Sequence, residues 1–269
     1  MHKAHRAGND FFSRSIKAYY DAPGVPGVYA ARSHLLAAES VILSRLADEL
    51  RDGSLLDIGV GPGRTIPFLR AACRRYTGID YSANMLFPGH ASHPGVDLLL
   101  CDARSLCFPA ASFDAVFFCN AIDDVGHEDR LRILREVHRV LRAPGIFVFS
   151  VHNLEADRKS PWALPHLSPR PGESLRALGK YLAGLVHHLR LRRHQESGRG
   201  YAVASDGYFG YGLLTYYVAR EAQIQQLAET GFSRIQEVGA DGTLLAPGAP
   251  CRDPWIFYIA RKDRSGASS

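Results

Sequence analysis

A cluster of glycines directly after an acidic residue is the part of this chain best suited to hold a ligand. Residues 55–65 read LLDIGVGPGRT, so that Asp57 ends a short apolar run and Gly59, Gly61 and Gly63 follow at alternate positions. Glycine lets the backbone turn sharply and approach a ligand without a Cβ in the way. A helix behind the loop would offer free N–H groups and the positive end of its dipole. The segment therefore predicts a binding loop between a strand and a helix.

Two classes of ligand are compatible with such a loop. A dinucleotide fingerprint has the spacing G-x-G-x-x-G, with an acidic residue about twenty positions later. Here the third glycine comes one residue early, because position 64 is Arg. The carboxylate of Asp57 would also repel a pyrophosphate, whereas it would suit a ligand that carries an ammonium group. An NAD-dependent oxidoreductase is therefore the weaker hypothesis.

The pattern Asp57-x-Gly59-x-Gly61-x-Gly63 resembles motif I of the class I S-adenosylmethionine-dependent methyltransferases. Four separate segments of the chain agree with this family in order and spacing. The resemblance implies S-adenosyl-L-methionine as the cofactor. It implies that the cofactor is held by Asp57, Gly59, Gly61, Gly63, Asp80, Tyr81, Asp102, Ala103 and Asn120.

Two further acidic residues have family roles that the resemblance carries over. Asp80 ends the second expected strand, where the family binds the two ribose hydroxyls. Asp102 follows the third, where the family recognises the adenine amino group with the backbone of the next residue, here Ala103. The resemblance covers residues 50–151 and, more weakly, 220–261, and it does not specify the methyl acceptor.

The elements that must position these residues alternate along the chain. Apolar runs expected as strands are 54–59, 76–80, 96–101, 113–119, 145–151, 232–240 and 254–260. Helical periodicity appears at 33–51, 63–74, 82–90, 127–142, 173–194 and 220–230. Such alternation predicts an α/β fold of the Rossmann-like, doubly wound type, with a mostly parallel seven-stranded sheet and an inserted helical lid after the fifth strand.

The same pattern suggests a division of the chain into five parts. These are N-terminal helices and a cap (1–52), an α/β core that binds the cofactor (53–153), an inserted lid (154–218), a C-terminal helix and hairpin that complete the sheet (219–262), and a disordered tail (263–269).

Residues after the fourth and fifth strands are candidates for acting on the methyl acceptor. Methyl transfer needs a base only when the acceptor has a proton to lose. His152 directly follows the fifth strand and could titrate near neutrality, and Asp123 is a second candidate, although both could be ordinary loop residues. Side chains expected to contact the acceptor, or else to pack the lid onto the core, are Tyr19, Tyr20, Asp124, Tyr208, Tyr211 and Tyr217.

Several motifs that are missing from the sequence narrow the chemical class of the methyl acceptor. The chain reads Asn120-Ala121-Ile122-Asp123 after the fourth strand, so the family's Asn-Pro-Pro-Tyr type motif for exocyclic amines and glutamine is absent. A Pro-Cys nucleophile and an acidic cluster with metal spacing are also absent. We therefore expect no nucleic acid and no metal, and instead methylation of an oxygen or nitrogen of a small aromatic or apolar metabolite, as in secondary metabolism. The alternative is a protein of this fold that performs non-methylating chemistry or only binds the cofactor.

The net charge of +5 is concentrated in one segment. Residues 155–200 hold nine Lys or Arg and four Asp or Glu. The amphipathic helix expected at 173–194, placed over the acceptor site, carries much of this charge. Its basic face has three interpretations: a solvated face, attraction to an anionic acceptor or carrier, or weak contact with an anionic membrane without stable insertion.

Cysteine usage bears on the compartment of the protein. Five cysteines without a C-x-x-C pair favour a reducing compartment, and the first twelve residues lack the apolar core of a signal peptide. We therefore expect a cytoplasmic protein, either a monomer or a homodimer.

Overall fold

The computed structural model describes residues 2–157, 162, 164, 170–205 and 210–264 of the 269-residue chain. Its helices, including two short 3-10 turns, are α1 (His2–Tyr20), α2 (Val25–Ala30), α3 (Ala37–Arg45), α4 (Ala47–Leu50), α5 (Ile66–Ala72), α6 (Ala83–Ser92), η1 (Ala103–Ser105), α7 (His127–Val140), α8 (Pro171–Leu191), η2 (Arg192–His194) and α9 (Arg220–Glu229). Its strands are β1 (Ser54–Ile58), β2 (Arg75–Asp80), β3 (Asp97–Leu100), β4 (Phe113–Phe118), β5 (Leu141–Asn153), β6 (Glu196–Gly198), β7 (Tyr201–Ser205), β8 (Leu214–Val218), β9 (Ser233–Gly239), β10 (Leu244–Leu245) and β11 (Trp255–Lys262).

The strands form one sheet with the order β10-β9-β11-β5-β4-β1-β2-β3. Strands β1 to β5 pair in parallel, and β11 enters between β5 and β9, antiparallel to both. This arrangement confirms the expected Rossmann-like, mostly parallel sheet. It also leaves the carboxyl ends of β1 to β5 at one edge, where ligands bind in open sheets of this kind.

The sheet is larger than the seven strands expected from the sequence. Within the described residues it has eleven, because β10 extends one edge and β6, β7 and β8 join the end of β5. Residues 201–217 belong to the segment expected as a lid and were not among the expected strands. They include β7 and β8. Tyr201 and Val203 are two residues apart on β7 and, like Tyr216 of β8, pack into the core, as expected for the inward side of a sheet.

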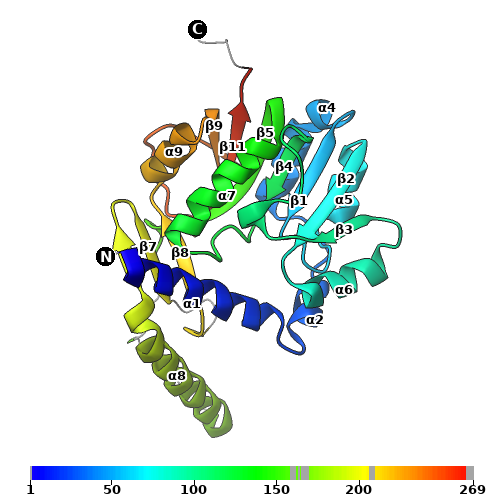
Figure 1. Ribbon diagram of the computed structural model, residues 1–269. Helices are drawn as coiled ribbons and strands as arrows, with labels where there is room; N and C mark the ends of the chain where they lie inside the picture. The colour runs from blue at the N-terminus through cyan, green and yellow to red at the C-terminus, as the bar shows by residue number, and fades with distance from the viewer. Residues whose placement is uncertain (1, 158–161, 163, 165–169, 206–209, 265–269) are drawn as a thin grey trace.

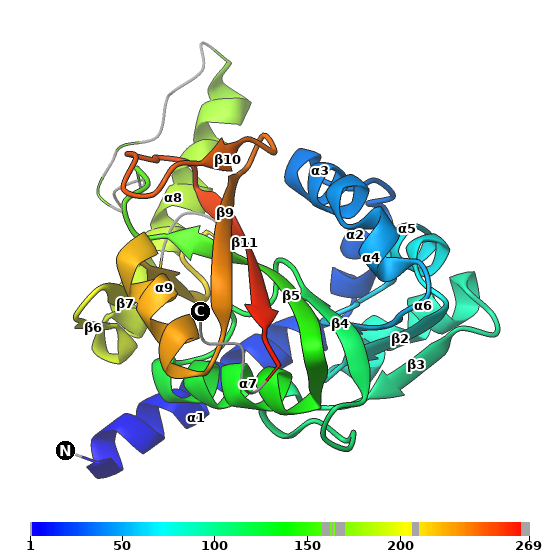
Figure 2. The same cartoon turned by 90° about the horizontal axis from the view of Figure 1, so that it is seen from above.

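Helices cover both faces of the sheet, as Figures 1 and 2 show, with α7 and α9 on one face and α3 to α6 on the other. One apolar core lies under α7, where Ile133, Leu134 and Val137 are buried together with Phe12 of α1. The second lies on the opposite face. Two-sided coverage explains why the central strands, such as the wholly buried β1, are continuous apolar runs.

The single helix expected over 33–51 is two helices in the structure. Helix α3 ends at Arg45, and Leu46 has backbone angles of −95° and 2° before α4 begins. Leu46 and Leu50 are still buried in the second core, so the apolar spacing was a correct guide to burial although the helix is broken.

Candidate active site

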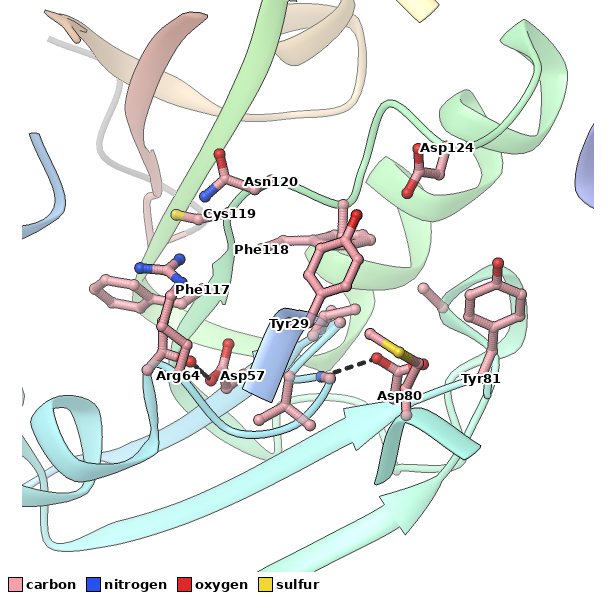
Figure 3. Close-up of a pocket in the computed structure, with 18 of the residues that line it drawn as sticks. Tyr29, Asp57, Arg64, Asp80, Tyr81, Phe117, Phe118, Cys119, Asn120 and Asp124 are labelled. Atoms are coloured by element: carbon pink, nitrogen blue, oxygen red, sulfur yellow. Dashed lines mark hydrogen bonds between the residues drawn. The ribbon is translucent and has the colours of Figure 1, made fainter. Parts of the chain in front are cut away.

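A cavity of about 320 Å³ lies at the carboxyl ends of the parallel strands. The glycine loop after β1 forms one wall, and the carboxyl ends of β2, β3, β4 and β5, with the residues just after them, contribute Asp80, Asp102, Asn120 and His152. Figure 3 shows this cavity, with Arg64 and Asp57 near the loop and Asp124 at the opposite side. Side chains from five different strand ends therefore meet in one space, which is large enough for a small organic ligand.

The glycine loop adopts a backbone that side chains would strain. Gly59, Gly61 and Gly63 have φ angles of 71°, 54° and 99°, all in the left-handed region. A Cβ on Gly59 would lie 2.7 Å from the Cβ of Ala121, and one on Gly63 would lie 2.7 Å from a methyl of Ile66. Gly59 and Gly61 line the cavity, whereas Gly63 is not part of its wall and serves the packing of the loop onto α5.

Asp57 lies at the end of β1 and is buried beneath the loop. Its Oδ2 accepts hydrogen bonds from Thr65 Oγ1 at 2.6 Å and from the Tyr76 hydroxyl at 2.8 Å. Burial raises the pKa of Asp57 to about 6, against the lowering effect of these two hydrogen bonds. The carboxylate thus also ties the loop to α5 and β2, beyond the ligand contact expected for it.

Asp80 connects the glycine loop to the end of β2. Its Oδ2 accepts the backbone N–H of Gly61 at 2.9 Å, the contact dashed in Figure 3, and its Oδ1 accepts that of Ser82 at 2.9 Å. Burial raises its pKa to about 6, although these backbone bonds act to lower it. A carboxylate has about four acceptor positions, so two remain for hydroxyl groups in the cavity.

Asp102 has a cationic partner that the sequence did not indicate. Arg104 donates to both Asp102 oxygens, with the shortest distance 2.6 Å, and reaches Asp129 at 3.1 Å. Burial acts to raise the pKa of Asp102, but the hydrogen bonds from Arg104 lower it below its usual value. Asp102, Ala103 and Tyr81 all line the cavity.

A buried ion pair at the cavity wall was missed by the sequence reasoning. Arg64 donates to both oxygens of Glu39, at 2.6 and 2.7 Å, and Asn120 Nδ2 donates to the same carboxylate at 3.1 Å. All three residues line the cavity. The available signal was Glu39 itself, an acidic residue on the apolar side of a predicted helix, between Leu36 and Ile42.

His152 lies in the cavity wall with a carboxylate behind it. Its Nδ1 is 2.8 Å from Asp123 Oδ2, which also accepts the His152 backbone N–H at 2.6 Å. The other oxygen of Asp123 accepts from the fully buried Arg130 at 2.8 Å, and Arg130 also donates to Gln223 at 2.6 Å. Asp123 is therefore not in the wall, but it contacts the histidine that is.

Asp124 faces the cavity with a very different set of partners. Its Oδ2 accepts the Tyr20 hydroxyl at 2.7 Å, and both residues line the cavity together with Tyr29. Withdrawal of the carboxyl group from water raises the pKa of Asp124 to about 7, and the bond from Tyr20 only partly opposes this. Neighbouring Asp123 and Asp124 therefore have different partners: Asp123 binds the buried guanidinium of Arg130, and Asp124 binds the phenol of Tyr20.

The inserted segment does not form the expected cover. Within its described residues, none lines the cavity, and Figure 1 shows α8 directed away from the sheet. Tyr211 packs against Gly184 of α8, and Tyr217 is buried behind His152 with ring centres 5.4 Å apart. Placing the helix over the acceptor site was therefore wrong for this part of the chain. Tyr208 lies outside the described residues.

The cover comes from the N-terminal helices instead. Tyr20 of α1, Tyr29 of α2, and Leu36 and Leu43 at α3 line the cavity. Tyr19 is absent from the wall and packs edge-on against the Tyr20 ring at 5.3 Å. Ser82 and Asn84, after β2, bind Asp21 through its side chain and backbone and anchor the end of α1.

Comparison with known proteins connects this geometry to a family. A family profile described as a methyltransferase domain matches residues 56–149, which include the glycine loop and strands β2 to β4. Over these residues the chain contains a methyltransferase domain of the class I S-adenosylmethionine-dependent type. The predicted family is thus confirmed.

Three proteins illustrate the range of relatives to which this chain is similar. A probable S-adenosylmethionine-dependent methyltransferase of Mycolicibacterium smegmatis is 29% identical over 48% of this chain and 49% of its own length. A ubiquinone/menaquinone biosynthesis C-methyltransferase of Desulfotalea psychrophila is 35% identical over 35% of this chain and 39% of its own. The chain spans about half the length of the first curated relatives it matches.

A solved structure supports the fold of this chain over nearly all of its length. It is the 1,6-didemethyltoxoflavin-N1-methyltransferase of Burkholderia thailandensis, with 1,6-didemethyltoxoflavin and S-adenosylhomocysteine bound. The TM-score is 0.56 and the identity 18%, with 97% of this chain and 90% of that chain covered. At this identity the similarity concerns the fold alone.

The residues at the cavity fit the cofactor of this family. Asp80 keeps acceptor positions for two hydroxyls, and a cavity of about 320 Å³ is within the range of small-molecule sites. Gly61 leaves its backbone open, with one methionine methyl 3.3 Å from where a Cβ would lie. Among the described residues, no group of three or more His, Cys, Asp or Glu side chains could hold a metal ion.

Proposed function

We propose that this protein is an S-adenosylmethionine-dependent methyltransferase that acts on an oxygen or nitrogen of a small aromatic or apolar metabolite. The observation that carries the proposal is the meeting of the glycine loop, Asp80 and His152 in one cavity. When bound, the cofactor supplies an electrophilic methyl group on a sulfonium. The similarity to a C-methyltransferase leaves a carbon acceptor as the competing hypothesis.

The apolar part of the cavity wall supports an aromatic or apolar acceptor. It includes Tyr20, Tyr29, Phe118 and Trp255, together with Leu36. Rings and aliphatic groups of this kind bind a planar apolar molecule and exclude water from it. Holding the acceptor atom in line with the reactive group is then the main contribution of the protein to the rate.

His152 is suited to take a proton from a hydroxyl or amine acceptor. Arg130 donates to one oxygen of Asp123, and the other oxygen lies 2.8 Å from Nδ1 of His152, where it accepts when Nδ1 carries the proton. In that tautomer the basic nitrogen is Nε2, where a proton from the acceptor would be held. Arg130 and Asp123 act through His152, so they are positioning residues.

The cofactor assignment is tested by calorimetric titration with S-adenosylhomocysteine. We expect binding by the wild type and at least about tenfold weaker binding by Asp80→Asn, because the neutral amide loses one acceptor oxygen and the charge that strengthens hydroxyl bonds. Asp97→Asn, on the neighbouring strand and exposed, is the matched control and should bind as the wild type does. An absence of binding at millimolar ligand would refute the proposal.

The acceptor class is tested by incubating the protein with S-adenosylmethionine and a panel of phenols, aromatic amines and carbon acids. Release of S-adenosylhomocysteine is measured for each. We expect turnover with a hydroxyl or amine acceptor, lowered about 100-fold by His152→Asn without change in cofactor affinity. Turnover with carbon acids alone would contradict the oxygen or nitrogen assignment. Cofactor binding without any turnover would favour the non-methylating alternative.

A further inference from the structure

Helix α8 has an apolar stripe whose side chains are exposed in the part of the chain that the structure describes. At 3.6 residues per turn, five aliphatic side chains of this helix fall within about 80° of its circumference. They form what we call the leucine stripe, which consists of Leu175, Leu178, Leu182, Val186 and Leu189, all exposed. Leu175 is 72% and Leu182 is 52% exposed, although burying a leucine is worth about 2 kcal/mol. The stripe extends for about 21 Å along the helix.

A different side of the same helix packs on the protein. His188 contacts Ser205 of β7 at 2.8 Å, Gly184 lies against Tyr211, and Leu191 is buried in the main core. The helix is therefore anchored at its C-terminal half by residues that lie outside the stripe. The exposure of the stripe follows from this anchoring, and Figure 1 shows the free half of α8 projecting from the body of the molecule.

Positive charge lies directly beside the leucine stripe. Residues 171–194 hold five Lys or Arg and one Glu. Arg176, Lys180 and Arg190 follow one edge of the stripe on the exposed surface, all within about a third of a turn of it. Trp162 and Leu164, which precede the helix in the chain, are 57% and 81% exposed and add apolar surface. An apolar stripe bordered by cations is the arrangement of a helix that lies in a lipid interface.

We propose that α8 binds the surface of an anionic lipid bilayer, with the leucine stripe in the acyl boundary and the basic edge at the head groups. Charge favours a lipid surface over a second copy of this chain as the partner of the leucine stripe, because a second copy would bring an equally basic helix to the same face. A lipid surface instead supplies the opposite charge and accepts an unbroken stripe without a matching groove. Among the described residues no helix is long and apolar enough to cross a membrane, so this contact is peripheral.

The test is co-sedimentation of the full chain with vesicles of phosphatidylcholine, with and without 30 mol% phosphatidylglycerol. We expect binding to the anionic vesicles that weakens with added salt. Leu175→Ser/Leu182→Ser should lower the partition coefficient at least about tenfold, because two apolar side chains leave the interface. Arg176→Glu/Lys180→Glu should lower it about 30-fold or more at low salt, because two attractive charges become repulsive.

The matched control is Phe87→Ser/Leu100→Ser, which changes two exposed apolar residues on α6 and β3. It should bind vesicles as the wild type does, and all variants should keep their affinity for S-adenosylhomocysteine. Equal loss in the control, equal binding to neutral vesicles, or no binding by the wild type would each overturn the proposal. So would a wild-type dimer in sedimentation equilibrium that Leu175→Ser/Leu182→Ser converts to a monomer, since a second copy would then cover the stripe.

Discussion

Neighbouring acidic residues at the end of β4 illustrate how partners decide the behaviour of a side chain. Asp123 binds a fully buried arginine and a histidine, whereas Asp124 binds a tyrosine hydroxyl at the cavity. Both have the same intrinsic chemistry and adjacent positions. Burial raises the pKa of Asp124 to about 7, and the hydrogen bond from Tyr20 only partly opposes this. Asp124 is therefore a group at the cavity that titrates near neutrality.

The raised pKa of Asp124 predicts a pH-dependent stability. The folded protein keeps this proton at pH values where the unfolded chain has released it, so the unfolding free energy falls as pH rises from about 4 to about 7. Asp124→Asn removes this contribution. The fall measured by urea unfolding should then be smaller by about 2 kcal/mol, less than the full shift implies because the carboxyl group keeps some solvent contact. Identical pH profiles of variant and wild type would refute the assignment.

Arg130 provides a second prediction at the residue scale. Its replacement in Arg130→Met leaves the buried Asp123 without its cation, which should cost about 3 kcal/mol of unfolding free energy. The matched control is Arg142→Met, which breaks a pair with Asp114 in which both side chains are more than a third exposed. That change should cost less than about 1 kcal/mol in the same urea titration. Equal costs would show that burial of the pair is unimportant.

The strand-to-helix loop is the element on which the cofactor assignment depends. Gly59 and Gly95 have similar φ angles, 71° and 78°, so alanine should strain both backbones by about 1 kcal/mol. A Cβ on Gly59 would also collide with Ala121, whereas one on Gly95 would meet nothing within 4 Å. The difference between these two positions isolates the effect of close packing.

We expect Gly59→Ala to lower the affinity for S-adenosylhomocysteine at least about tenfold, because the loop must shift to relieve the collision. Gly95→Ala should leave that affinity unchanged within about twofold. Calorimetric titration of both variants measures the contrast. Similar affinities would mean that the loop adapts without moving its backbone in the cavity.

At the scale of the whole molecule, the cavity joins two parts of the chain that are distant in sequence. The N-terminal helices supply the cover, and the strand ends supply the floor, with Asp21 bound to Ser82 and Tyr20 bound to Asp124. A ligand held between them should stabilise both together. The described part of the insertion contributes nothing to this wall.

Hydrogen exchange measured by mass spectrometry should report this coupling. Addition of S-adenosylhomocysteine at saturating concentration should slow exchange in residues 13–43 and in the loop 59–65, because opening of the cover then requires loss of ligand. Exchange in α8 should stay the same, since it has no contact with the cavity. Slower exchange in α8 and none in residues 13–43 would show that the insertion is the true cover.

Local patterns were sufficient for much of this protein. The glycine spacing after Asp57 and the alternation of apolar runs with helical periods depend on neighbours in the chain, so they predicted the fold, the family and the edge of the sheet that binds the cofactor. Burial was likewise predicted where periodicity was strong, as in α7.

Other features required the tertiary structure because they depend on residues that are far apart in sequence. The pairing of Arg64 with Glu39, the contact of His152 with Asp123 and the pKa of Asp124 all arise when separate strand ends meet. The same holds for the cover. An amphipathic pattern predicts that α8 has an apolar side, but its anchoring to β7 through another side decides that this stripe faces outward. Periodicity along one helix does not encode which neighbour that helix will meet.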